Sequence, residues 1–380
     1  MTPAPALEVV QWEVTRRCDQ NCRMCCLGGP GNEGEELSTA ECFDLIEQFS
    51  ALGVREVHLF GGEAYLRPDF TLLLRRLASR AMKIALTTGG RRFPVEALCD
   101  PQIRPAVEHV LLSIDGLEKT HDALRGTPGG FDAALATLMA LRRERLPVGV
   151  TSQINRRNMF ELETLGEFLA RLGVGFWHVQ LTEPFGNARL RIDELLQPSD
   201  LPGALDMLLR IRRSVRRLGM WLRPGNNLGY HGPRSRALRS GAAFGEEYRN
   251  CRQGVRYVAL QPDGTVKGCA SCAAGIDTVH HSVRARSLAA IWNDEASFAW
   301  TRRWSPERLW GFCASCEHAT LCRAGCIQTS QALFGRPGNN PYCEHRVLWL
   351  NARGMREEVV AAPDGTLEVV ALADAPRVEK

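Results

Sequence analysis

The chain has 380 residues, 44% of them hydrophobic and 24% charged, and its formal net charge is +4. This length allows one large domain or two smaller ones, and so mild a charge gives no reason to expect nucleic acid as a partner. No apolar run of about 18 residues is present, and no basic N-terminal region precedes an apolar stretch, so neither a membrane span nor a secretory signal is predicted. The 14 cysteines therefore favour reduced, metal-binding thiols in the cytoplasm over a disulfide framework.

Short β-rich runs alternate with amphipathic helical stretches through the first half of the chain. The predicted strands are 8–15, 56–60, 82–88, 110–115, 147–154 and 175–181, and the predicted helices between them include 39–52, 69–80, 130–145 and 160–172. Ser38 followed by Glu41 is a capping-box pattern, which predicts a helix start at residue 39. Six β–α repeats imply an α/β fold with a parallel sheet and right-handed crossovers. Because eight repeats make a complete barrel, we expect a partial (β/α)6 barrel.

The second half of the chain has a different character. An arginine-rich helix is predicted at 201–218, and its arginines are expected to face solvent, with docking of an acidic peptide as the alternative. Those arginines are Arg210, Arg212, Arg213, Arg216 and Arg217. Later, periodicity fades while cysteines recur, so metal should organise that part, and Pro363-Asp364-Gly365 predicts a hairpin in the tail. The expected organisation is a barrel over 1–222, a linker over 223–250, a cysteine-rich domain over 251–349 and a tail over 350–380.

Cys18, Cys22 and Cys25 stand in the spacing C-x3-C-x2-C directly after the first predicted strand. The C-terminal ends of barrel strands carry active sites, and thiolates are the usual ligands of iron–sulfur clusters. Three cysteines leave one iron of a [4Fe–4S] cluster without a protein ligand, and such an iron can bind a small molecule. Zinc with Cys26 as a fourth thiolate is the alternative, although adjacent cysteines suit a tetrahedral site poorly.

This motif and the residues at the following strand ends resemble the radical S-adenosylmethionine (SAM) superfamily. Gly61-Gly62-Glu63 ends the second strand, and in that family this motif holds the amino group of SAM. Ser113-Ile114-Asp115-Gly116 ends the fourth, where relatives contact the ribose or carboxylate. The resemblance implies SAM contacts by Met24, Gly61, Gly62, Glu63, Thr87, Ser113, Asp115, Arg125, Gln153 and Phe185. Two positions depart from the family: Met24 replaces an aromatic residue and Ala64 a frequent proline.

Seven downstream cysteines resemble the complete pattern of the SPASM domain, a C-terminal extension of the same superfamily that binds two auxiliary clusters, taken here to be [4Fe–4S]. The resemblance implies Cys313, Cys316, Cys322 and Cys343 as ligands of the outer cluster, and Cys251, Cys269 and Cys326 as ligands of the inner one. The fourth inner ligand is left open between Cys272, which could chelate together with Cys269, and an open iron facing substrate. A zinc module using the same pairs is the alternative, and Cys42 and Cys99 are expected to be packed thiols.

The resemblance implies reductive cleavage of SAM to methionine and a 5'-deoxyadenosyl radical, which then removes hydrogen from a substrate. A ribosomally made peptide is expected, because most enzymes with this extension act on peptides, and flavodoxin or ferredoxin would donate electrons. Only 17 residues precede Cys18, so a separate leader-recognition protein is also expected. One alternative is a dehydrogenase or epimerase that acts on a sugar or nucleoside. The other is a non-catalytic electron carrier, but such a protein would not need the Gly-Gly-Glu motif. Ala270, an aspartate in sulfatase-maturing relatives, disfavours that branch.

Overall fold

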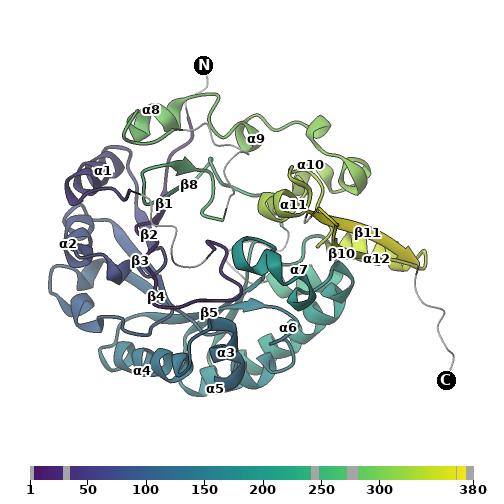
Figure 1. Ribbon diagram of the computed structural model, residues 1–380, viewed down its shortest axis with the longest axis horizontal. Coiled ribbons are helices and arrows are strands. Elements are labelled where there is room, and N and C mark those ends of the chain that lie inside the picture. Colours follow the sequence, from purple (N-terminus) through teal and green to yellow (C-terminus); the bar gives the residue numbers. More distant parts are fainter. Residues whose placement is uncertain (1–3, 29–34, 241–247, 272–280, 365, 374–380) are drawn as a thin grey trace. The chain divides into compact units, whose positions relative to one another are not determined.

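The computed structural model describes residues 4–28, 35–240, 248–271, 281–364 and 366–373 (Figure 1). Contacts divide the chain into two compact units, and each unit combines two separate segments. The first unit contains residues 1–151 and 252–304, and the second contains 152–251 and 305–380. The domain boundaries expected from the sequence therefore remain a prediction. No helix in the described part of the chain is long and apolar enough to cross a membrane.

The first unit is built on parallel strands that follow one another in chain order. These strands are β1 (Val9–Glu13), β2 (Glu56–Phe60), β3 (Lys83–Thr88), β4 (Val107–Ser113) and the start of β5 (Val148–Ile154). Each pairs in parallel with the next. The helices are α1 (Thr39–Ala51), α2 (Phe70–Ser79), α3 (Glu118–Arg125) and α4 (Gly130–Arg143), and α1, α2 and α4 lie along one side of the strands (Figure 1). The predicted β–α alternation is confirmed, with termini that differ by a few residues.

Local sequence signals explain how these elements begin and pack. Ser38 accepts a hydrogen bond from the Glu41 amide, and the Glu41 carboxylate accepts one from the Ser38 amide at 2.7 Å, so the predicted capping box is present. Strand β1 turns Trp12 towards α1, where its ring meets Phe49 edge-on at 5.5 Å between centroids. Both rings are buried, and burial of such large apolar surfaces holds the helix on the sheet.

Two strands from the cysteine-rich half belong to the same sheet, which the sequence did not predict. Strand β8 (Tyr257–Leu260) pairs in parallel with β1, and β9 (Val266–Lys267) pairs antiparallel with β8. Among the described residues the strand order is β7-β6-β5-β4-β3-β2-β1-β8-β9, a mainly parallel α/β sheet of the partial-barrel type. Helices α8 (Leu288–Asn293) and α9 (Ala299–Arg302) complete the first unit. Strands as short as β8 and β9 carry no readable periodicity.

The second unit contains β6 (Phe176–Leu181) paired in parallel with β7 (Trp221–Pro224), together with α5 (Leu162–Arg171) and α6 (Leu201–Arg217). The segment 223–250, expected to be a linker, contains the end of β7 and helix α7 (Pro233–Arg239). The expected solvent-facing arginines of α6 are found at Arg210, Arg213, Arg216 and Arg217, which are exposed. Arg212 is the exception, because it is half-buried and donates to the carbonyl oxygen of Leu238 at the end of α7.

The rest of the second unit consists of short helices and a hairpin. The helices are α10 (Ala319–Cys322), α11 (Ile327–Phe334) and α12 (Glu344–Asn351), and the hairpin is β10 (Met355–Ala361) with β11 (Leu367–Ala373), as predicted. The single-turn helices of this unit occupy Gly186–Leu190, Ile192–Glu194, Pro198–Asp200, Pro306–Arg308 and Gly311–Ser315, and those of the first unit occupy Ala64–Leu66, Val95–Cys99 and Arg104–Ala106. Glu344 is fully buried and accepts hydrogen bonds from the Ser235 amide and hydroxyl at 2.7 and 2.6 Å, which joins α12 to α7.

Candidate iron–sulfur and SAM site

The loop that follows β1 carries Cys18, Cys22 and Cys25, and it lies against the Gly-Gly-Glu segment that follows β2. The Gly62 amide donates to the Thr15 carbonyl oxygen and the Glu63 amide to the Arg17 carbonyl oxygen, both at 2.8 Å. A Cβ atom at Gly61 would lie 2.3 Å from the Thr15 oxygen, and one at Gly62 would lie 2.2 Å from the Arg17 oxygen. Both glycines are therefore required by contact with the cysteine loop, whereas the sequence analysis assigned them to contact with SAM.

The C-terminal end of α3 supports the same loop from another side. The Leu124 carbonyl oxygen accepts from the Arg23 amide at 2.8 Å, and a Cβ atom at Gly126 would lie 2.3 Å from the Asn21 oxygen. Gly126 has φ of +59°, a conformation that favours glycine. The helix end and the cysteine loop thus pack backbone to backbone, and any side chain at residue 126 would force them apart.

Arg125 joins this helix end to the cysteine loop electrostatically. Its Nη1 donates to Cys22 Sγ at 3.7 Å, and its Nε donates to Asp115 Oδ2 at 2.7 Å. Asp115 is fully buried at the end of β4, so the guanidinium supplies the charge that its carboxylate needs. Arg125, expected from the sequence to contact SAM, lies in contact with a cysteine sulfur in the structure.

Burial controls the protonation of the thiols on this loop. Desolvation raises the pKa of Cys18 to about 12 and also raises the pKa of Cys22, while the Arg125 charge lowers the pKa of Cys22. A Cys25 thiolate would raise the pKa of Cys22 further, so the sulfurs are close enough to influence one another. The buried Cys18 and Cys22 thiols therefore ionise more readily beside a bound cation, and iron supplies that charge. The donor set on this loop therefore fits a cluster held by three thiolates.

Glu63 is held in a buried pocket formed at the ends of β2 and β3. It is 3% exposed, its Oε1 accepts from the Gly89 amide at 2.6 Å, and its other oxygen accepts from the Thr88 hydroxyl. Burial raises the pKa of Glu63 to about 7 against these two hydrogen bonds. Thr88, which the sequence analysis passed over in favour of Thr87, is the threonine that orients this carboxylate. A carboxylate so desolvated is suited to pair with an ammonium group.

The sequence matches two protein-family models. Residues 12–169 match the radical SAM superfamily, and residues 251–317 match SPASM, an iron–sulfur cluster-binding domain. The chain belongs to the radical SAM superfamily. It is an enzyme of that superfamily with a SPASM domain, and its cofactors are SAM, a [4Fe–4S] cluster and auxiliary clusters.

Similar proteins match this radical SAM chain over most of its length. The AdoMet-dependent heme synthase of Methanosarcina barkeri is 27% identical over 359 residues, covering 91% of this chain and 98% of the relative. The mycofactocin maturase MftC of Mycobacterium tuberculosis is 27% identical over 344 residues, covering 87% and 81%. Among solved structures, Streptococcus suis SuiB bound to S-adenosylmethionine has a TM-score of 0.69 at 16% identity and covers 89% of this chain and 76% of its own. This structural likeness shows the fold alone.

The remaining predicted SAM contacts of the radical SAM fold are divided between the two units. Met24 and Ser113 are buried in the first unit, and Thr87 is half-buried there. Gln153 on β5 and Phe185 after β6 belong to the second unit, and both are half-buried. Their roles towards SAM stay predictions.

Four cysteines of the SPASM region line one cavity of the second unit. They are Cys313, Cys316, Cys322 and Cys343, and the cavity also touches Phe312, His318 and Asn340. Desolvation raises the pKa of each of these four thiols, that of Cys343 to about 12. Such a set fits a fully thiolate-ligated cluster by the same argument as the first loop, because a metal must supply the charge that burial opposes.

The cysteines predicted to hold the inner cluster are distributed differently. Cys251 and Cys326 lie in the second unit, Cys269 lies in the first, and Cys272 lies outside the described residues. Around Cys326, the structure reveals a carboxylate that sequence reasoning missed: Glu183 Oε1 accepts from Cys326 Sγ at 3.7 Å and from the Thr329 hydroxyl at 2.6 Å. Its position two residues after β6, next to the predicted contact Phe185, was the available signal.

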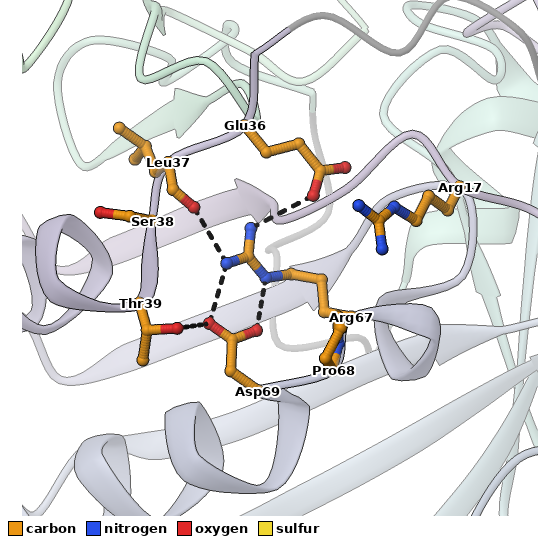
Figure 2. A pocket seen from close by; sticks show the side chains of 8 residues that line it. All are labelled: Arg17, Glu36, Leu37, Ser38, Thr39, Arg67, Pro68 and Asp69. Atoms are coloured by element: carbon orange, nitrogen blue, oxygen red, sulfur yellow. Dashed lines mark hydrogen bonds and ion pairs between the residues drawn. The ribbon is translucent and has the colours of Figure 1, made fainter.

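A second feature missed from the sequence is a buried arginine beside the cysteine loop. Figure 2 shows the Arg67 guanidinium between Glu36, Leu37 and Asp69, at a cavity of about 520 Å³. Arg67 binds both oxygens of Asp69 at 2.8 and 2.9 Å and donates to the carbonyl oxygens of Val14 and Leu37. Because these bonds use four of the five N–H groups of the guanidinium, Arg67 ties together the segments after β1, after β2 and before α1.

Proposed function

We propose that this radical SAM enzyme generates a 5'-deoxyadenosyl radical at the loop after β1 and uses it to abstract hydrogen from a substrate. A bound [4Fe–4S] cluster would supply the electron that breaks the sulfonium C–S bond of SAM. The observation that carries the proposal is the arrangement of the three loop thiols, the Arg125 guanidinium on Cys22 and the buried Glu63 carboxylate. A non-catalytic electron carrier would need the thiols but would not need a desolvated carboxylate placed to receive an amine.

In this proposal each residue has a physical task. Cys18, Cys22 and Cys25 would hold three irons, and the Arg125 charge favours the thiolate form of Cys22, which partly offsets the burial that raises the pKa of that thiol. Glu63 binds the ammonium group of SAM, and Thr88 orients that carboxylate. Met24 is 4% exposed beside the cysteines and packs against the apolar parts of the cofactor. The burial of Glu63 and Met24 would limit the access of competing hydrogen donors to the radical.

Glu63→Ala is expected to weaken SAM binding about ten- to hundred-fold, because a charge-assisted hydrogen bond in a buried site contributes about 1.5–3 kcal/mol. Equilibrium dialysis of labelled SAM against the cluster-loaded protein measures this change, with iron content recorded on the same sample. Glu118→Ala, which removes an exposed carboxylate at the start of α3, is the matched control and should leave affinity unchanged. Equal affinity in the Glu63 variant with its iron intact would mean that Gly61-Gly62-Glu63 serves only as a turn against the cysteine loop.

We further propose two auxiliary clusters, an outer one held by Cys313, Cys316, Cys322 and Cys343 and an inner one that includes Cys251, Cys269 and Cys326. Iron and sulfide analysis of anaerobically reconstituted protein is therefore expected to find about three [4Fe–4S] clusters per chain. An auxiliary cluster would accept the electron that is released when the substrate is oxidised. Net oxidations such as crosslinking or dehydrogenation are therefore the reactions that this arrangement favours. About one cluster together with tightly held zinc would contradict this assignment and favour a zinc module.

For the substrate we propose a ribosomally made peptide, with a separate leader-recognition protein and a flavodoxin or ferredoxin as partners. The similarity to the mycofactocin maturase, over 87% of this chain and 81% of that protein, supports this class. A heme precursor is the second candidate, because the similarity to the AdoMet-dependent heme synthase of Methanosarcina barkeri covers 91% of this chain and 98% of that relative. Both substrate classes are compatible with the same radical chemistry, and they differ only in which molecule loses hydrogen to the 5'-deoxyadenosyl radical.

One mass-spectrometric experiment separates these substrates. The cluster-loaded enzyme is supplied with SAM and a reductant, and then with either a precursor peptide encoded beside it or an iron porphyrin that carries carboxylate side chains. Peptide modification is expected as a mass change that depends on SAM and is lost in Cys22→Ala. Turnover of the porphyrin alone would assign the small-molecule reaction, and a SAM-dependent change in a sugar or nucleoside would restore the earlier alternative.

A further inference from the structure

Three potential metal ligands outside the cysteine groups converge on the second unit. Glu317, His318 and His345 each offer one ligand atom, and these three atoms all lie within 4.8 Å of one another. Glu317 Oε1 lies 3.8 Å from His318 Nε2 and 3.7 Å from His345 Nε2, so the carboxylate reaches both imidazoles. Neither histidine entered the functional reasoning from the sequence, because they are 27 positions apart along the chain.

The two imidazoles are held in place by the surrounding structure. The His318 amide donates to Cys316 Sγ at 3.4 Å, and its ring stacks on His231 with centroids 4.3 Å apart and an angle of 18°. His345 lies in the first turn of α12, edge-on to His318 at 4.9 Å. The side chains of His318 and His345 are 22% and 25% exposed, whereas that of Glu317 is 72% exposed. The two imidazoles are thus held in place by their neighbours, whereas the exposed Glu317 carboxylate is free to change its side-chain conformation.

The spacing of these atoms suits a small divalent ion. Ligand atoms about 2.0–2.2 Å from Zn²⁺ in a tetrahedral site lie about 3.3–3.6 Å from one another. The two separations from Glu317, 3.8 and 3.7 Å, are slightly longer, and rotation of its exposed side chain can shorten both. The two imidazole ligand atoms lie within 4.8 Å of each other, so a small adjustment of the rings is also needed to grip an ion. Two imidazoles and a carboxylate are also a borderline donor set without sulfur, which favours zinc over iron–sulfur assembly.

A cavity gives an ion access to the three residues. It has a volume of about 290 Å³ and is lined by them together with His231, Gly232, Pro233, Arg236 and Leu348. Its opening leaves room for water or another ligand at a fourth coordination position, as in zinc sites that are not closed by protein. Arg236 contributes a positive charge to the wall, which makes a neutral or anionic fourth ligand the better complement.

We propose that Glu317, His318 and His345 form a binding site for a divalent transition-metal ion such as Zn²⁺, separate from the cysteine clusters and open to this cavity. The site lies on the loop that carries Cys316, so an ion there would stiffen the segment that holds the outer cysteine set. It requires no radical chemistry and goes beyond the proposed function.

The test is anaerobic equilibrium dialysis of the cluster-loaded protein against Zn²⁺, with zinc and iron counted in the same sample. About one zinc ion per chain is expected, with iron content unchanged. Glu317→Gln and His345→Ala should each weaken zinc binding at least about ten-fold, since each removes one of three ligands. Glu307→Gln, at an exposed carboxylate of the same unit, is the matched control and should bind zinc as the unaltered protein does.

Three results would overturn the proposal. The first is that no zinc is retained. The second is that a Glu317→Gln/His345→Ala double variant binds zinc with unaltered affinity. The third is that zinc enters only as iron is lost, which would place the ion on the thiols. The Glu317 variant guards against misfolding, because its side chain is mostly exposed and its replacement should leave the cysteine cavity and the iron content intact.

Discussion

Cys22→Ala is expected to reduce the formation of 5'-deoxyadenosine from SAM to background. The variant removes one of three thiolates that would hold the cluster, and it removes the sulfur to which Arg125 donates at 3.7 Å. Without that thiolate only two of the three proposed ligands, Cys18 and Cys25, remain, and the loop cannot present a cluster with one open iron. Chromatography of the reaction with dithionite as reductant measures the loss, and iron analysis should show a deficit of about one cluster.

Cys26→Ala is the matched control for this prediction, because Cys26 lies on the same loop, one residue after Cys25, and is exposed. It should cleave SAM at the rate of the unaltered protein. If the loop instead held zinc through four thiolates, the two variants would lose metal equally. Undiminished cleavage in Cys22→Ala, or equal losses in both variants, would remove this loop as the site of the chemistry.

Arg125→Met is expected to lower the free energy of unfolding by about 3–5 kcal/mol, because it leaves the Asp115 carboxylate buried without a partner charge. Asp115 is 0% exposed, and both guanidinium contacts to its Oδ2 are short, at 2.7 Å from Nε and 2.5 Å from Nη2. Methionine retains much of the side-chain volume, so the effect reports charge rather than a cavity. Urea unfolding of the cluster-loaded protein, followed by circular dichroism, gives the change.

Two further variants separate the ion pair from other roles of this residue. An Asp115→Asn/Arg125→Met double variant should recover most of the loss, because it removes the buried negative charge together with its partner. Arg92→Met, at an exposed arginine of the same unit, should change stability by no more than about 0.5 kcal/mol. A double variant as unstable as the single one would mean that packing of α3 on the cysteine loop, and not the ion pair, sets the stability.

Much of this protein could be predicted from local patterns in its sequence. Alternation of apolar residues along β1 to β6 and the capping box at Ser38 depend on neighbours a few positions away, so strands and helices were found at nearly their true bounds. The cysteine spacings are local in the same sense, and Glu63 could be singled out through the resemblance of Gly61-Gly62-Glu63 to a radical SAM motif. The parallel order of the first strands then follows from the β–α alternation and the handedness of its crossovers.

Only the tertiary structure decided how distant segments meet. Strand β8 pairs with β1 although about 250 residues separate them, and four-residue strands show no period from which this could be read. Residues 61 and 62 must be glycine because carbonyl oxygens of the cysteine loop lie too close for a side chain. Arg125 donates a hydrogen bond to the sulfur of Cys22, which lies 103 positions away in the sequence. The triad of Glu317, His318 and His345 likewise exists only after α10 and α12 are placed. A sequence pattern constrains the conformation of neighbouring residues, whereas contacts between segments depend on the path of the whole chain.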